Sequence, residues 1–121
     1  MSTVLPTPEA IRALSEAPDT GPVVMLNLLK FKPGGVESYA KYGRAVLKMI
    51  EAMGGKVIYS GPVETTVVGD SKWDATLLVQ YPSRKAFLKM IADPEYQKHH
   101  VYREQALEAA ELYATHSGTV A

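Results

Sequence analysis

The residues best suited to chemistry lie near the end of the chain, where histidines and an arginine recur at helical spacing. Groups three or four positions apart share one helical face, and here they are Tyr96, His99 or His100, Arg103 and Leu107. Arg103 could bind a carboxylate through two hydrogen bonds, and His99 or His100 could move a proton near neutral pH. This face fits the rim of a pocket.

The same residues also have a structural interpretation. Arg103 could instead bridge to Asp74 or Glu95, and both histidines could lie on a solvated helix face. For His99 and His100 taken singly the solvated face is favoured, whereas for Arg103 both interpretations stay open.

Asn27 lies in the middle of an apolar stretch, PVVMLNLLKF, at positions 22–31. Strand alternation puts it on one face with Met25 and Leu29, and the other face is apolar as well. Such a strand must be covered on both sides. The amide is then buried, where an unpaired polar group costs about 1–3 kcal/mol. It could donate to a substrate carbonyl or carboxylate, or a backbone group or water could satisfy it.

Trp73 and Asp74 are expected to open a strand beside a turn. The tryptophan could close one end of a cavity and the aspartate could orient Arg103 or a hydroxyl group, although a tryptophan in a sheet more often belongs to the core. Glu64 follows a bend at Gly61-Pro62 and could act as a base if it points inward. Otherwise it is an exposed strand residue.

Four tyrosines could belong either to a core whose edges reach solvent or to the wall of an aromatic pocket. They are Tyr39, Tyr42, Tyr59 and Tyr81. Of these, Tyr42 and Tyr59 are the candidates for contact with a substrate. No metal is expected, because His99 and His100 diverge by about 100° on a helix and no HxxxH or HxxE pair supports them. Phosphate-binding glycine motifs and a GxSxG motif are also missing from the sequence.

The elements that must position these residues follow from caps, breakers and periodicity. We expect a leading helix from Thr7 to before Pro18. The expected elements after it are a strand at 23–31, a helix at 37–53, a strand at 56–68 bent at Gly61-Pro62, a strand at 73–81, a helix at 83–91 and a helix from 93 to about 111. Residues 112–117 could close the sheet or continue the helix.

This order, β-α-β-β-α-β, predicts an α+β ferredoxin-like domain at 22–121, with an antiparallel sheet and helices on one face. Residues 1–21 form an N-terminal arm. The uncovered sheet face looks apolar, with Trp73, Ala75, Leu77, Val79 and Tyr81 on one side of the strand at 73–81. We therefore expect a homodimer that closes this face sheet to sheet.

Composition narrows the class of protein. The 121 residues suit one domain, and 13 basic residues balance 13 acidic ones, which disfavours nucleic acid as a partner. The absence of cysteine excludes disulfides, thiolate metal sites and a cysteine nucleophile. No apolar run is long enough to cross a membrane, so a soluble cytoplasmic protein is expected.

Several motifs together resemble the family called domain of unknown function 1330, within the dimeric α/β-barrel superfamily. They are MLNLLKF at 25–31, YSGP at 59–62, WD at 73–74, YPSRKAF at 81–87 and DPEYQ at 93–97, followed by Arg103. The resemblance implies a ferredoxin-like fold, a dimeric α/β barrel and a pocket between sheet and helices in each subunit. It implies no reaction.

Relatives in the wider superfamily include antibiotic-biosynthesis monooxygenases, muconolactone-type isomerases and heme-degrading monooxygenases, several of which need no added cofactor. Heme-degrading relatives use an asparagine, a tryptophan and a histidine, which Asn27, Trp73 and His99 or His100 would supply in a different placement. A heme-degrading activity is the least favoured of the alternatives.

We expect a small-molecule-binding protein, and first a cofactor-independent enzyme of isomerase, lyase or monooxygenase type. Its substrate would be a small carboxylated or carbonyl-bearing compound. Asn27 and Arg103 would hold a polar group, and His99, His100 or Glu64 would carry a proton. The alternative is a ligand-binding or dimerisation module without catalysis.

Overall fold

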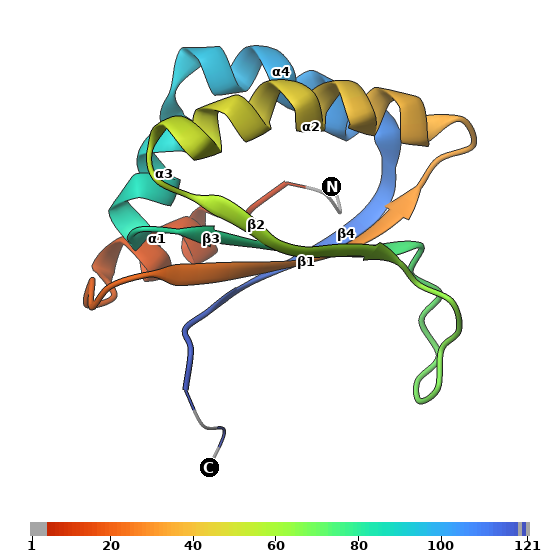
Figure 1. The fold of residues 1–121 in the computed structure, drawn as a ribbon, viewed down its shortest axis with the longest axis horizontal. Coiled ribbons are helices and arrows are strands. Elements are labelled where there is room, and N and C mark those ends of the chain that lie inside the picture. The colour runs from red at the N-terminus through yellow and green to blue at the C-terminus, as the bar shows by residue number, and fades with distance from the viewer. Residues whose placement is uncertain (1–4, 119, 121) are drawn as a thin grey trace.

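The computed structural model describes residues 5–118 and 120 of the chain, and within them the chain forms four helices and four strands. In chain order these are α1 (Pro8–Glu16), β1 (Val23–Phe31), α2 (Gly35–Ala52), β2 (Lys56–Pro62), β3 (Ala75–Tyr81), α3 (Arg84–Ala92), α4 (Pro94–Ala106) and β4 (Leu107–Thr115) (Figure 1).

The strands form one antiparallel sheet in the order β2-β3-β1-β4. Helices α2 and α4 lie side by side over one face of the sheet, and α1 and α3 lie at one end (Figure 1). Asn27 of the central strand β1 is opposite Leu77 of β3 and Leu112 of β4. This is the ferredoxin-like α+β arrangement that the sequence predicts.

Three helices begin at the predicted caps. The side chain of Thr7 accepts a hydrogen bond from the backbone N–H of Ala10 at 3.1 Å, and Ser83 does the same for Ala86 at 3.0 Å. Asp93 accepts from the N–H of Glu95 at 2.8 Å at the start of α4. Caps of this kind satisfy the N–H groups that a helix leaves unpaired at its first turn.

The core lies between the sheet and the helices. Alternate residues of β1 point towards the helices and are buried, whereas those between them are half-buried. The largest buried cluster joins the sheet to α2, α3 and α4, and its members are Val23, Met25, Val46, Ile50, Val79, Tyr81, Phe87, Met90 and Tyr96. This packing joins α4 to the core through Tyr96.

The start of α2 touches the end of α4 directly. Gly35 lies so close to the carbonyl oxygen of Ala106 that a Cβ atom would clash with it. The same oxygen accepts a hydrogen bond from the N–H of Lys32 at 2.8 Å. A glycine is needed at Gly35 because two backbones approach each other there.

The strand expected at 56–68 is shorter than predicted, because β2 ends at Pro62 and residues 63–74 form a loop. Beyond Pro62 the N–H of Val63 still donates to the carbonyl oxygen of Asp74 at 2.9 Å, at the point where the loop opens. Trp73 and Asp74 belong to this loop and not to β3, which begins at Ala75. The run of β-branched residues that suggested a strand lies in this loop, where Val67 and Val68 are 87% and 92% exposed.

The last helix ends earlier than predicted, and the closing strand left open for 112–117 is confirmed, although it begins sooner. Helix α4 ends at Ala106, and Leu107–Thr115 forms β4 on the edge of the sheet next to β1. The run of alanine and glutamate has helical propensity, but pairing with β1 and burial of Leu107 outweigh it.

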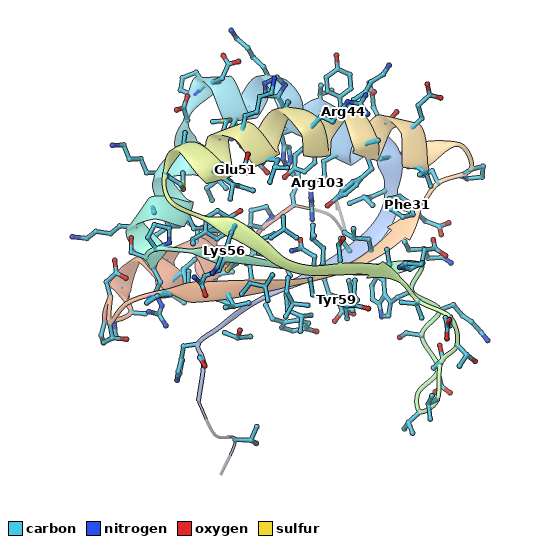
Figure 2. All side chains as sticks on the ribbon, in the orientation of Figure 1. Phe31, Arg44, Glu51, Lys56, Tyr59 and Arg103 are labelled. Atoms are coloured by element: carbon cyan, nitrogen blue, oxygen red, sulfur yellow. The ribbon has the colours of Figure 1, made fainter. Side chains whose placement is uncertain are left out.

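The face assigned to β3 requires a correction as well. Ala75, Leu77, Val79 and Tyr81 point to the helices, since Val79 and Tyr81 belong to the core beneath them. The uncovered face carries other residues, namely Val24, Leu26, Leu28, Thr76, Leu78 and Gln80 with Tyr59 of β2 and Tyr113 of β4. Figure 2 shows Tyr59 on the side away from the helices. The centre of this outer face is apolar, through residues other than those predicted, with the polar Thr76, Gln80 and Glu111 beside it.

Candidate functional site

A cavity of about 650 Å³ lies between the covered face of the sheet and the helices. Its apolar walls come from the segment before α1, from α1 and α3, and from β1 and β4, and include Leu5, Leu14, Met25, Phe87, Ile91 and Leu112. Its polar lining comes from β1, α2 and α4 and includes Asn27, Tyr42, Tyr96, His100, Arg103 and Glu104. A few polar groups on apolar walls are typical of small-molecule sites.

Arg103 is the buried charge of the cavity. It lies on α4, is 6% exposed, and is situated between the helix layer and the sheet (Figure 2). Its guanidinium hydrogen-bonds with Tyr39 and counteracts the rise of the tyrosine pKa that burial causes. A guanidinium stays charged at any physiological pH and offers donors in a fork that matches a carboxylate.

A line of hydrogen bonds runs beside Arg103. The hydroxyl of Tyr42 on α2 lies 3.0 Å from the hydroxyl of Tyr96 on α4, which in turn lies 3.2 Å from Nδ1 of His100. The two residues of α4 are four positions apart and so share one helical face. Three groups that can each pass a proton are therefore connected at the cavity wall.

Burial sets the charge of these groups. It raises the pKa of Tyr42 well above the usual value and also raises that of Tyr96, so both phenols are neutral at physiological pH. Burial is also the main cause that lowers the pKa of His100, followed by the charge of Arg103, while Glu104 acts in the opposite direction. The lowered pKa favours the neutral imidazole of His100 at pH 7.

Asn27 is buried at 8% exposure and lines the cavity. Its Nδ2 donates to the backbone oxygens of Leu77 at 3.2 Å and Met25 at 3.4 Å. The amide is thus satisfied by neighbouring backbone groups, which was the structural alternative, while its side chain still contributes to the wall.

The structure keeps three sequence-predicted site residues away from the cavity lining. Glu64 is exposed in the loop at 63–74, and Trp73 is half-buried near the end of that loop. Tyr59 is 55% exposed on the outer face of β2. The placements follow from the strand limits, since β2 bulges between Val57 and Tyr59 and ends before Glu64, and β3 begins only after Trp73. Trp73 therefore does not join Asn27 in the trio of heme-degrading relatives.

Asp74 and His99 also lie outside this cavity. The Oδ2 atom of Asp74 accepts a hydrogen bond from the N–H of Phe31 at 2.8 Å, so the carboxylate joins the loop to the end of β1. Nε2 of His99 lies 3.4 Å from Oε1 of Glu95, one turn earlier on α4. These two residues have structural partners.

Sequence reasoning missed Glu104 and the contribution of the arm. Glu104 follows His100 by four residues, and that spacing was a usable signal. The arm gave no such signal, because contact between Leu5 or Leu14 and the distant strands depends on how the whole chain folds. Within residues 5–118 and 120, no group of three metal-binding side chains comes together, and no helix is long and apolar enough to cross a membrane.

The chain belongs to the family described as a domain of unknown function, DUF1330, whose model matches residues 29–115. A crystal structure of a protein of unknown function from Rhodopseudomonas palustris is 34% identical, with a TM-score of 0.88, and the match covers 98% of this chain and 99% of that one. No curated protein matches the chain.

Two more distant structures share the fold alone. One is a protein from Arabidopsis thaliana, with 17% identity and a TM-score of 0.65 over 82% of this chain and 98% of that one. The other is a dimeric protein of unknown function with a ferredoxin-like fold from Bacteroides fragilis, with 12% identity and a TM-score of 0.56 over 78% and 94%.

Proposed function

We propose that this member of the DUF1330 family binds a small organic molecule with a carboxylate or carbonyl group in the cavity between sheet and helices. The observation that carries the proposal is the buried cation Arg103 at the wall of that cavity, beside the line of Tyr42, Tyr96 and His100. Arg103 would hold the polar group, and His100 would carry a proton.

The chemistry of the walls favours an organic acid or carbonyl compound. A guanidinium away from bulk water interacts strongly with a carboxylate, because fewer water dipoles screen the charges. The aromatic and aliphatic walls, including Phe87 and Leu112, would contact the hydrocarbon part of the same molecule. A carbonyl oxygen would take the same place with weaker hydrogen bonds.

A connected line of proton-carrying groups favours an enzyme over a passive pocket. Such a site could catalyse an isomerase, lyase or monooxygenase type of reaction with the protein's own groups. One observation favours the alternative of a ligand-binding or dimerisation module, since the amide of Asn27 is already bonded to the backbone of Leu77 and Met25.

The proposal includes two features of the assembly. Of the arm expected at 1–21, residues 1–4 lie outside the described residues, and the part from Leu5 on would cover the domain formed by 22–121, as the contribution of Leu5 and Leu14 to the cavity wall supports. The domain would form a homodimer through its outer sheet face, where the half-buried Leu26 and Leu28 lie beside the 50% exposed Tyr113. The dimeric neighbour from Bacteroides fragilis supports this.

The proposal is tested by titrating ¹⁵N-labelled protein with small carboxylates, each compared with its methyl ester, beginning with benzoate and methyl benzoate. We expect the carboxylate to bind more tightly and to shift the amide signals of the cavity walls. Arg103→Gln keeps a polar side chain that can donate hydrogen bonds, although a shorter one, and removes the charge. It should weaken carboxylate binding by about tenfold or more, and ester binding less.

Arg44→Gln is the matched control, since Arg44 is exposed on α2 (Figure 2). This variant should bind like the original protein. Equal binding by the two variants, or no carboxylate bound at all, would contradict the proposal. For any molecule that binds, a new product found by mass spectrometry indicates an enzyme, and saturable binding without product indicates the module.

A further inference from the structure

We propose that Glu104 is a positioning residue that keeps the proton of neutral His100 on Nε2, so that Nδ1 is the base at the end of the tyrosine line. This inference rests on the proposed function, in which His100 carries a proton. It assigns a direction to the hydrogen bonds and a role to a residue that sequence reasoning did not select.

The geometry around Nε2 supports this role. The atom is buried and has no hydrogen-bond partner among the residues that the structure describes. Oε1 of Glu104 lies 3.4 Å away, within range of charge interaction but without the alignment of a hydrogen bond. Since the side chain of Glu104 is 44% exposed, a small rotation can improve the contact. The negative charge favours the tautomer whose N–H points towards it.

A proton on Nε2 fixes the direction of the remaining bonds. Nδ1 of His100 is then an acceptor and receives the hydroxyl proton of Tyr96, at 3.2 Å. The hydroxyl oxygen of Tyr96 is in turn free to accept from Tyr42, at 3.0 Å. Both hydroxyl groups thus point along one line from the cavity to the imidazole.

This line can take one proton from a bound acid without any further reactant. The ligand loses a proton to the oxygen of Tyr42, which passes its own proton to Tyr96, and Tyr96 passes its own to Nδ1 of His100. The tyrosines end neutral, His100 becomes an imidazolium, and the ligand is left with one more negative charge. Arg103 can stabilise that charge, and Glu104 can stabilise the imidazolium.

The charged groups around His100 act in opposite directions. On α4, Arg103 lowers the pKa of His100 and Glu104 raises it, and burial lowers it most. Helix α2 contributes Tyr42, which is neutral. The parts of α1, α3 and β4 that line the cavity contribute uncharged residues, such as Leu14, Ile91 and Leu112. Glu104 is therefore the acid that acts on this imidazole.

The test is NMR of the full chain labelled with ¹⁵N in its histidines, which reports the tautomer and the pKa of each imidazole. We expect neutral His100 to carry its proton on Nε2. In Glu104→Gln the pKa of His100 should fall further, because the charge that raises it is gone, and the tautomer preference should weaken. Tyr96→Phe removes the donor to Nδ1 and should also weaken the preference.

Glu95→Gln is the matched control, because Glu95 stands four residues from His99 at the same 3.4 Å. It should alter the signals of His99 and leave those of His100 unchanged. A proton on Nδ1 of His100 in the original protein, or no change of His100 in Glu104→Gln, would overturn the inference.

The two proposals fail in different ways. Loss of the tautomer preference leaves carboxylate binding by Arg103 intact. A protein that binds no carboxylate can still hold the Nε2 proton beside Glu104.

Discussion

At the scale of single residues, burial gives the site its chemical character. Tyr42 and Tyr96 stay neutral and His100 is kept uncharged because water is largely excluded from them, so that Arg103 is the cation of the group at neutral pH. A neutral imidazole can accept a proton, which a charged one cannot. The same burial links the site to the stability of the fold.

We expect folding stability to fall as the pH is lowered through the range where histidine titrates. The unfolded chain takes up a proton on His100 near its ordinary pKa of 6.5, whereas the folded chain does so only at lower pH. Protons therefore favour the unfolded state between the two pKa values, and the loss ends below the folded one. Urea unfolding at several pH values measures this. Between about pH 7 and 5 the free energy of unfolding should fall less steeply for His100→Asn than for the original protein.

His99→Asn is the control for this measurement. It removes a histidine of the same helix that lies outside the cavity, beside Glu95, and it should not reproduce the shallower loss expected of His100→Asn. If His100→Asn and the original protein lose stability in parallel across this range, the imidazole is not held neutral by the fold.

Residue spacing was enough to predict part of this site. Tyr96, His100 and Arg103 share a helical face, and helical periodicity is a local property of the chain. Trp73 and Glu64 were misplaced because their directions depend on where a strand ends. Strand ends are set by pairing between distant segments, which local patterns record weakly.

At the scale of elements, the site depends on how closely α2 approaches α4. Tyr42 and Tyr96 can bond only if these two helices stay in contact, and Gly35 permits that contact beside Ala106. The sequence predicted both helices, but it gave no sign that α4 ends at Ala106 and turns directly into β4. Helical propensity at 107–111 was outweighed by pairing with β1.

We expect Gly35→Ala to destabilise the protein by about 1–3 kcal/mol, because the new methyl group meets the carbonyl oxygen of Ala106 and must separate the helices. Gly43→Ala is the matched change in the same helix, where an added Cβ meets nothing within 4 Å. It should stabilise by about 0.5–1 kcal/mol through helix propensity. Urea unfolding measures both changes in stability. An unchanged free energy of unfolding in Gly35→Ala would show that the helices are not held this closely.

At the scale of the whole molecule, the two faces of the sheet have different environments. The helices cover one face, and the cavity lies there, while the outer face presents Leu26, Leu28 and Leu78 without a cover in one chain. The apolar character of this outer face was visible in the alternation of the first strand. The residues contributed by β3 were assigned to the wrong side, because alternation alone does not say which side the helices occupy.

We expect the protein to sediment with about twice the 13.2 kDa mass of one chain, because pairing of outer faces would remove this apolar surface from water. Leu26→Lys places a charge on that face and should shift the protein towards single chains. Val101→Lys on α4, where Val101 is 46% exposed, should leave the mass unchanged. A single-chain mass for the original protein at micromolar concentration would exclude a stable dimer.

The most direct test of the account is a crystal structure grown with the carboxylate that binds most tightly in the titrations, beginning with benzoate. We expect its carboxylate on the guanidinium of Arg103 and its ring against the apolar walls between sheet and helices. A carboxylate bound elsewhere on the molecule, with Arg103 making no contact to it, would contradict the assignment of this cavity as the binding site.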